Sequence, residues 1–189
     1  IETLILNNEN AILNIENGNV NFIVSRNKKL IVNDGLMNVD GGTISLLYNS
    51  SIGIYNNGEL VINNGTIQTS ESGCRCIYNK GKTTMKGGVV KKSYNGYGVI
   101  DNYNELYVEG GEISNSNGNA IENYAEKELI GKVKITGGRI SGTLYSICNY
   151  NNSEIEMLGG EIESSGSGIY NNANAKVLID GGTINTEKE

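Results

Sequence analysis

Tyrosines at repeated spacing are the first residues in this chain whose chemistry suggests binding. The chain of 189 residues holds 11 Tyr against one Phe and no Trp. Six of these tyrosines flank an asparagine that recurs down the chain. Three follow it directly, and they are Tyr103, Tyr124 and Tyr150. Three precede it directly, and they are Tyr55, Tyr78 and Tyr170. An exposed strip of aromatic rings can bind sugar rings or a protein partner, with phenol hydroxyls as polar handles. A tyrosine ladder that only stacks on itself also explains the pattern.

Two carboxylates stand beside this strip. Asp101 and Glu122 replace tyrosine at the position before the recurring asparagine, in two successive repeats. Two acids about 5 Å apart can hold Ca²⁺ or act as an acid/base couple. The sequence shows no third ligand, so the pair also fits ordinary surface charge. We therefore expect no metal site and no cofactor, and we assign Asp101 and Glu122, with the three tyrosines Tyr103, Tyr124 and Tyr150, to a hypothetical ligand-binding face.

A Gly-Gly pair, with Asn64-Gly65 as its variant, recurs along the chain and indicates the repeated elements that position these side chains. The second glycines are Gly42, Gly65, Gly88, Gly111, Gly138, Gly160 and Gly182. Two residues after each comes a β-branched aliphatic, and these are Ile44, Ile67, Val90, Ile113, Ile140, Ile162 and Ile184. A repeat of this length indicates a stacked array in which each unit buries its apolar face against its neighbours.

The recurring asparagine forms a second anchor, in the pattern Ile-x-Asn. Its members are Asn33, Asn56, Asn79, Asn102, Asn123, Asn149 and Asn171. A buried asparagine is tolerable when its amide is paired, and stacking pairs it with the asparagines above and below. We expect these seven side chains to form one buried ladder.

Each repeat has room for three short strands and no helix. Apolar residues lie five and three positions before the second glycine, as in Leu60 and Ile62, which places both on one face of an extended chain. The leucine-rich frame and the calcium-binding nonapeptide are both absent. The sequence predicts an all-β, right-handed parallel β-helix with about 22–23 residues and three short strands per coil. Residues 1–30 are expected to form an N-terminal coil or cap on the repeats of residues 31–189, within a single domain.

One repeat carries about six extra residues, close to Ala125–Ile130, directly after Tyr124. Insertions in a solenoid map to loops on one face, often the face that binds. This loop either borders a site or reflects neutral drift.

The composition of the chain excludes some classes of binding partner. The formal net charge is −6, with pI near 4.8, which argues against nucleic acid and anionic membrane surfaces. No apolar run approaches a membrane span, so we expect no membrane insertion. Cys74 and Cys76 lie two residues apart and Cys148 about three coils away, so no disulfide is expected. Further domains of the same polypeptide are expected beyond this segment.

The frame Gly-Gly-x-Ile followed by x-Ile-x-Asn resembles the repeats of bacterial right-handed β-helix surface proteins. These include polymorphic outer membrane proteins and pectin-lyase-like adhesins of Gram-positive bacteria, which strings such as Gly53–Gly58 and Asp180–Ile184 resemble. The resemblance covers residues 31–186. It implies an extracellular or cell-surface location and a glycan or host surface protein as partner, while enzymes share the same scaffold.

The resemblance also implies which residues an enzyme of this fold would need. Hydrolases of the fold use clustered Asp with a His, and this chain has no His. Lyases of the fold use a basic residue, and the candidate here is Arg139, which falls between Glu112 and Glu161 of the adjacent coils. Arg139 is either part of a solvated ladder of opposite charges or a catalytic base. We expect no catalytic residue and no enzyme activity. The favoured function is an adhesin-like recognition domain, with a ligand-free stalk and a polysaccharide lyase or hydrolase fragment as alternatives.

Overall fold

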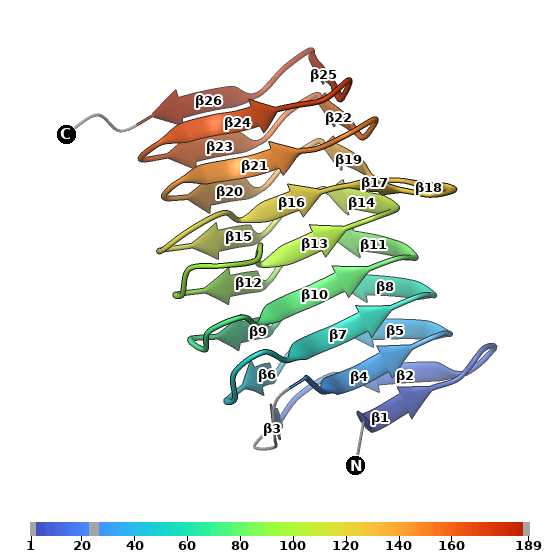
Figure 1. Cartoon of the computed structure of the whole chain (residues 1–189). Helices are drawn as coiled ribbons and strands as arrows, with labels where there is room; N and C mark the ends of the chain where they lie inside the picture. Colours follow the sequence, from blue (N-terminus) through green and yellow to red (C-terminus); the bar gives the residue numbers. More distant parts are fainter. Residues whose placement is uncertain (1–2, 23–26, 187–189) are drawn as a thin grey trace.

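A computed structural model describes residues 3–22 and 27–186, and in these residues it contains strands and turns without a helix. The strands form three parallel eight-stranded sheets that wind as a solenoid (Figure 1). Accordingly, the described residues contain no helix with the length and apolar character of a membrane span. The predicted all-β parallel solenoid with three strands per coil is confirmed.

Each coil contributes one strand to each sheet. Sheet A contains β1 (Thr3–Asn7), β4 (Lys29–Asn33), β7 (Ile52–Asn56), β10 (Arg75–Asn79), β13 (Ile100–Asn102), β16 (Ile121–Asn123), β21 (Tyr145–Asn149) and β24 (Ser167–Asn171). Sheet B contains β2 (Ile12–Ile15), β5 (Leu36–Val39), β8 (Glu59–Ile62), β11 (Lys82–Met85), β14 (Glu105–Val108), β19 (Lys132–Ile135), β22 (Glu154–Met157) and β25 (Lys176–Ile179). Sheet C contains β3 (Asn19–Phe22), β6 (Thr43–Leu46), β9 (Thr66–Thr69), β12 (Val89–Lys92), β15 (Glu112–Asn115), β20 (Arg139–Gly142), β23 (Glu161–Ser164) and β26 (Thr183–Thr186).

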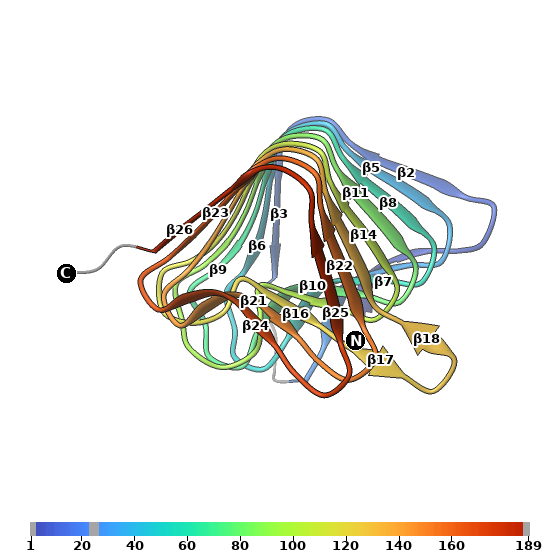
Figure 2. The same ribbon diagram turned by 90° about the horizontal axis from the view of Figure 1, so that it is seen from above.

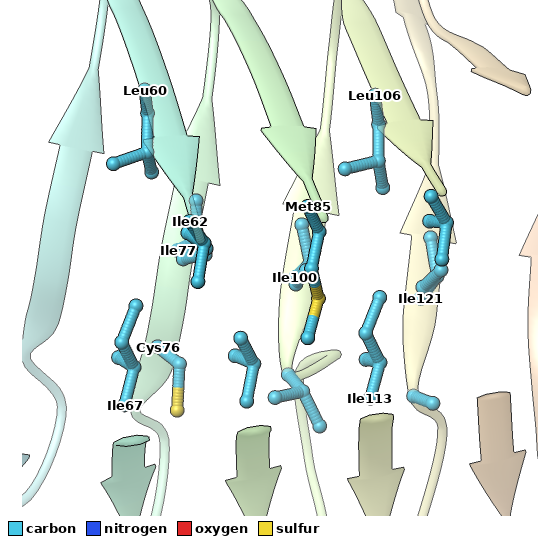
Figure 3. Packing of buried hydrophobic residues seen from close by; sticks show 14 of the residues in the cluster. Leu60, Ile62, Ile67, Cys76, Ile77, Met85, Ile100, Leu106, Ile113 and Ile121 are labelled. Carbon is cyan, nitrogen blue, oxygen red and sulfur yellow. The ribbon is translucent and has the colours of Figure 1, made fainter. Parts of the chain in front are cut away.

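The core consists of aliphatic residues stacked on their equivalents in the next coil. In sheet A, Ile77 pairs with Ile100, and Ile100 pairs with Ile121, and all three are fully buried. Figure 3 shows these side chains between the three sheets, with Leu60 and Leu106 repeating along sheet B. Because each position is repeated, the register that buries one coil buries all of them.

The asparagine ladder is present and runs in one direction. The Nδ2 of each member donates to the Oδ1 of the next, at 2.7–2.8 Å along the whole series. The ladder has one member that sequence reasoning missed, Asn7, which pairs with Asn33. One predicted member, Asn171, is exposed, because no described strand lies beyond β24.

The first coil is built from residues 3–22, where β1, β2 and β3 pair with the strands of the second coil. The predicted cap boundary at residue 30 therefore falls inside β4, which belongs to the second coil. Residues 1–2, 23–26 and 187–189, which belong to the two predicted segments, lie outside the described residues.

The Gly-Gly turn between sheets B and C needs glycine for two reasons. Gly88 has φ +74°, in the left-handed region that favours glycine. A Cβ added there would lie 2.7 Å from the carbonyl oxygen of Gly65 in the coil below. Because the coils approach this closely at the turn, a side chain is excluded as well as the backbone conformation.

The insertion forms a small antiparallel hairpin, β17 (Ala125–Glu126) and β18 (Leu129–Ile130), where sequence analysis predicted a loop. It projects from the corner between sheets A and B, as the view along the solenoid shows (Figure 2). The hairpin begins directly after Tyr124, as predicted.

Candidate functional site

The tyrosines of sheet A form one continuous column rather than two separate rows. Ring centroids are 5.1 Å apart for Tyr55 and Tyr78 and 4.9 Å for Tyr78 and Tyr103. The spacing is 5.1 Å from Tyr103 to Tyr124 and again from Tyr124 to Tyr150. A tyrosine before the asparagine and one after it both point outward, and their rings meet in the same column.

This stacking limits what the column offers a ligand. Tyr103 and Tyr124 lie 19° from parallel, and Tyr124 and Tyr150 lie 13° from parallel. The two faces of Tyr124 are therefore covered by its neighbours, and all three rings are half-buried. A sugar ring binds to an aromatic face, so this column presents ring edges and hydroxyl groups instead.

Asp101 and Glu122 are aligned in adjacent strands, as predicted, but they are buried rather than on the surface. Their exposed fractions are 1% and 6%. The chain segment before β13 closes over them, since a Cβ at Gly98 would lie 3.1 Å from Asp101 Oδ1 and 3.1 Å from Glu122 Cγ. Alternation along the strand correctly predicted that both side chains point away from the core. It could not predict that the segment before β13 would bury them.

The buried carboxyls are held by a polar network. Arg75 Nε donates to Asp101 Oδ2, and the Arg75 guanidinium lies 3.3 Å from the centroid of the Tyr97 ring. Glu122 accepts hydrogen bonds from the Tyr124 hydroxyl and from Asn119 Nδ2. Among the described residues, neither Asp101 Oδ1 nor Asn119 Oδ1, both buried, has a hydrogen-bond partner.

The electrostatics of this network follow from its burial. Burial raises the pKa of Asp101 to about 7, Arg75 opposes this shift, and the neighbouring Glu122 adds to it. Burial and the hydrogen bond to Glu122 likewise raise the pKa of Tyr124 above its ordinary value. Because Asp101 lies against Arg75 and its raised pKa leaves it partly protonated near neutral pH, Asp101 and Glu122 together have little excess negative charge to attract a divalent ion. The described residues contain no group of three or more His, Cys, Asp and Glu side chains placed to hold a metal.

A buried lysine fastens the segment that covers the carboxyls. Lys92 Nζ donates to the carbonyl oxygen of Cys74 at 2.8 Å and to that of Tyr97 at 2.7 Å. Burial lowers the pKa of Lys92. The three cysteines are free and buried, and burial raises the pKa of Cys76 to about 12, which makes that thiol unreactive at neutral pH.

A groove on the outer face of sheet C was missed by sequence reasoning. It has a volume of about 640 Å³ and crosses six coils. Its floor is one outward row in register, formed by Ser45, Gln68, Lys91, Ser114, Ser141 and Glu163. The polar character of this row was visible in the sequence, but the hollow depends on the turns that follow each strand.

Arg139 lies in the wall of this groove, between two carboxylates. Its guanidinium contacts Glu163 and lies 3.8 Å from Glu112 Oε1. The upper partner predicted from sequence was Glu161, which is aligned with Arg139 in the sheet, while the ion pair forms with Glu163. Hydrogen bonding to Glu163 raises the pKa of Arg139, so this geometry favours the charge-ladder interpretation over a catalytic base.

Two candidate binding sites therefore lie on the lateral faces, a closed tyrosine column on sheet A and an open groove on sheet C. Comparison of the chain with protein-family models, with curated proteins and with solved structures finds no match. A function for this chain is therefore argued from the geometry of its faces.

Proposed function

We propose that this β-solenoid is a non-catalytic recognition domain that binds an extended, hydroxyl-rich glycan along the groove of sheet C. The observation that carries the proposal is the groove itself, with serine, glutamine and lysine side chains at the same position of successive coils. Hydroxyl and amide groups are the partners that sugar hydroxyls use in hydrogen bonding. The adhesin-like role and the cell-surface location implied by the family resemblance belong to this proposal.

The spacing of the groove favours a glycan over a peptide. Successive coils of a parallel sheet rise by about 4.8 Å, so equivalent side chains recur at that interval. In an extended peptide, side chains that point in the same direction recur about every 6.6 Å, so they do not stay aligned with successive coils of the groove. One sugar unit of an extended glycan is close to the coil rise, which allows each coil to contact one unit.

The charges of the groove favour a neutral glycan. Arg139 is neutralised by Glu112 and Glu163, and Lys92 is engaged with backbone carbonyl groups. Lys91 is left as an outward cation on the floor, in a chain whose net charge is −6. The overall negative charge would repel a polyanionic glycan, whereas a neutral glycan would experience no such repulsion.

A glycan array of neutral and acidic linear oligosaccharides tests the proposal. We expect binding to neutral members, and we expect Ser114→Trp to weaken it by about tenfold or more by filling the middle of the groove. The matched control is Ser167→Trp, the same substitution at an exposed position on sheet A. Equal affinities of the two variants would exclude the groove, and the absence of any bound glycan would favour the stalk.

The tyrosine column is the second candidate site, because it holds Tyr103, Tyr124 and Tyr150 together beside the hairpin. If it binds the ligand through its edges and hydroxyls, Tyr124→Ala weakens binding and Ser114→Trp does not. Asp101 and Glu122 would then support the column from beneath rather than contact the ligand.

We further predict no lyase activity. Arg139 is held by two carboxylates, and Arg75 by Asp101, so neither is placed to accept a proton. Incubation with pectin, alginate and glycosaminoglycans should release no product with the ultraviolet absorbance of an unsaturated uronic acid. Release that is lost on Arg139→Ala would replace the recognition proposal with the enzyme alternative.

A further inference from the structure

The outer face of sheet B carries charges that alternate in sign from coil to coil. The first residue of six successive strands is Glu59, Lys82, Glu105, Lys132, Glu154 and Lys176. Neighbours in a sheet that carry opposite charges stabilise it slightly, so alternation alone is compatible with a solvated ladder.

The ion pairs within this row are confined to its two ends. Lys82 Nζ lies 3.0 Å from Glu59 Oε1, and Lys176 Nζ lies 3.2 Å from Glu154 Oε1. Among the residues that the structure describes, neither Glu105 nor Lys132 forms an ion pair. Glu105 Oε2 accepts a hydrogen bond from the Tyr107 hydroxyl at 3.2 Å, which leaves its charge without a cationic partner, so both central charges of the row can pair with another molecule.

When the row of charges is reversed and set against the original row, each charge lies opposite a charge of the other sign. A second copy placed face to face and antiparallel, about a two-fold axis between β14 and β19, sets Glu105 opposite the partner's Lys132 and Lys132 opposite the partner's Glu105. The same operation matches every other charge of the row with its opposite. A parallel copy in register would set like charges against each other, which is destabilising.

The second outward row of sheet B obeys the same symmetry. Tyr107 and Lys134 are aligned in neighbouring strands, so the axis that relates β14 to β19 sets Tyr107 against the partner's Lys134. A lysine over a tyrosine ring is a favourable contact. At the ends of the row, Leu178, which is 55% exposed, is set against the partner's Val61.

We propose that the outer face of sheet B is the interface of an antiparallel homodimer, with Glu105 and Lys132 at its two-fold axis. An isologous interface needs one surface patch that complements itself, which this row provides. The face also has a hollow of about 630 Å³, lined by Tyr107, Lys134 and Leu178 among others, which a second copy can fill.

The contact area predicts a weak dimer. Six strands at about 4.8 Å and four residues at about 3.3 Å give an overlap of about 400 Å² per copy. This is below the size of a stable interface, so we expect association in roughly the ten to hundred micromolar range. The sheet fans out along the solenoid (Figure 2), so the contact is closest at the axis. Glu105 and Lys132 should therefore matter most.

Sedimentation equilibrium over this concentration range tests the proposal. We expect a monomer–dimer equilibrium that weakens as salt is raised, because exposed charges are screened. Glu105→Lys or Lys132→Glu alone should weaken dimerisation by about tenfold. Glu161→Lys, a charge reversal on sheet C, is the control and should leave it unchanged. A chain that stays monomeric at low salt throughout the range overturns the proposal.

The double variant E105K/K132E separates a dimer contact from a ladder within one chain. Across the two-fold axis the swap restores opposite charges, so dimerisation should return to near the parent level. Within one chain the swap places like charges side by side at Lys82 and at Glu154. Failure of the swap to restore the dimer, in variants whose melting temperatures show that they are folded, would overturn the antiparallel arrangement.

Discussion

Asn102→Ala should lower the free energy of unfolding by about 1–3 kcal/mol more than Asn171→Ala. Asn102 Nδ2 donates to Asn123 Oδ1 at 2.8 Å and to two carbonyl oxygens, and its Oδ1 accepts from Asn79 at 2.7 Å. Alanine leaves these buried groups without a partner. Asn171 is exposed at the end of the ladder, so water can replace the contacts that it loses.

Urea unfolding of both variants measures this difference. Asn102→Asp provides a sharper comparison, since aspartate has nearly the same shape but sets a carboxylate against Asn123 Oδ1 and against carbonyl oxygens. It should destabilise at least as much as alanine. Equal midpoints for the Asn102 and Asn171 variants would show that the ladder does not contribute to stability through its hydrogen bonds.

The parent protein should lose stability as pH rises from 5 to 8, and Asp101→Asn should remove most of this loss. The pKa of Asp101 is raised to about 7 in the folded state from the ordinary value of 3.8. Between these values the folded state binds a proton that the unfolded state has lost, so stability falls with rising pH until the folded carboxyl ionises. Over this interval the loss is about 2–3 kcal/mol.

Thermal or urea unfolding at pH 5 and pH 8 measures the effect. Relative to the parent, Asp101→Asn should gain stability on going from pH 5 to pH 8, while exposed Asp180→Asn should follow the parent. The groups facing Asp101 are Arg75, Glu122, Lys92 and the neighbouring tyrosines. A parent whose stability rises over this interval would contradict an Asp101 carboxyl that is protonated below neutral pH.

The parts of the fold that repeat could be predicted from sequence. The positions of Asn33 to Asn149 followed from spacing, because every coil satisfies the same steric and hydrogen-bonding demands. Asn7 also stands in an Ile-x-Asn frame, Ile5-Leu6-Asn7, and the 26 residues that separate it from Asn33 equal the separation of Asn123 and Asn149, so the signal was present and was passed over when residues 1–30 were assigned to a cap. The hairpin at Ala125–Ile130 was located but expected to be a loop, since its two short strands carry no repeat signal.

The site depended on contacts between coils that spacing does not encode. Alternation showed that Asp101 points away from the core, whereas its burial comes from the backbone near Gly98 and from the fastening by Lys92. The groove on sheet C arises where turns of different coils stand beside a row of polar residues. Neither feature is a property of one repeat, so the sequence pattern could not predict it.

The most direct test of glycan recognition in the groove is an amide NMR titration with a neutral glycan that the array identifies. The predicted result is that chemical-shift changes gather on Gln68, Lys91, Ser114 and Ser141, in register along sheet C, and that they disappear in Ser114→Trp. Changes confined to Tyr103, Tyr124 and Tyr150, with the groove unaffected, would contradict it.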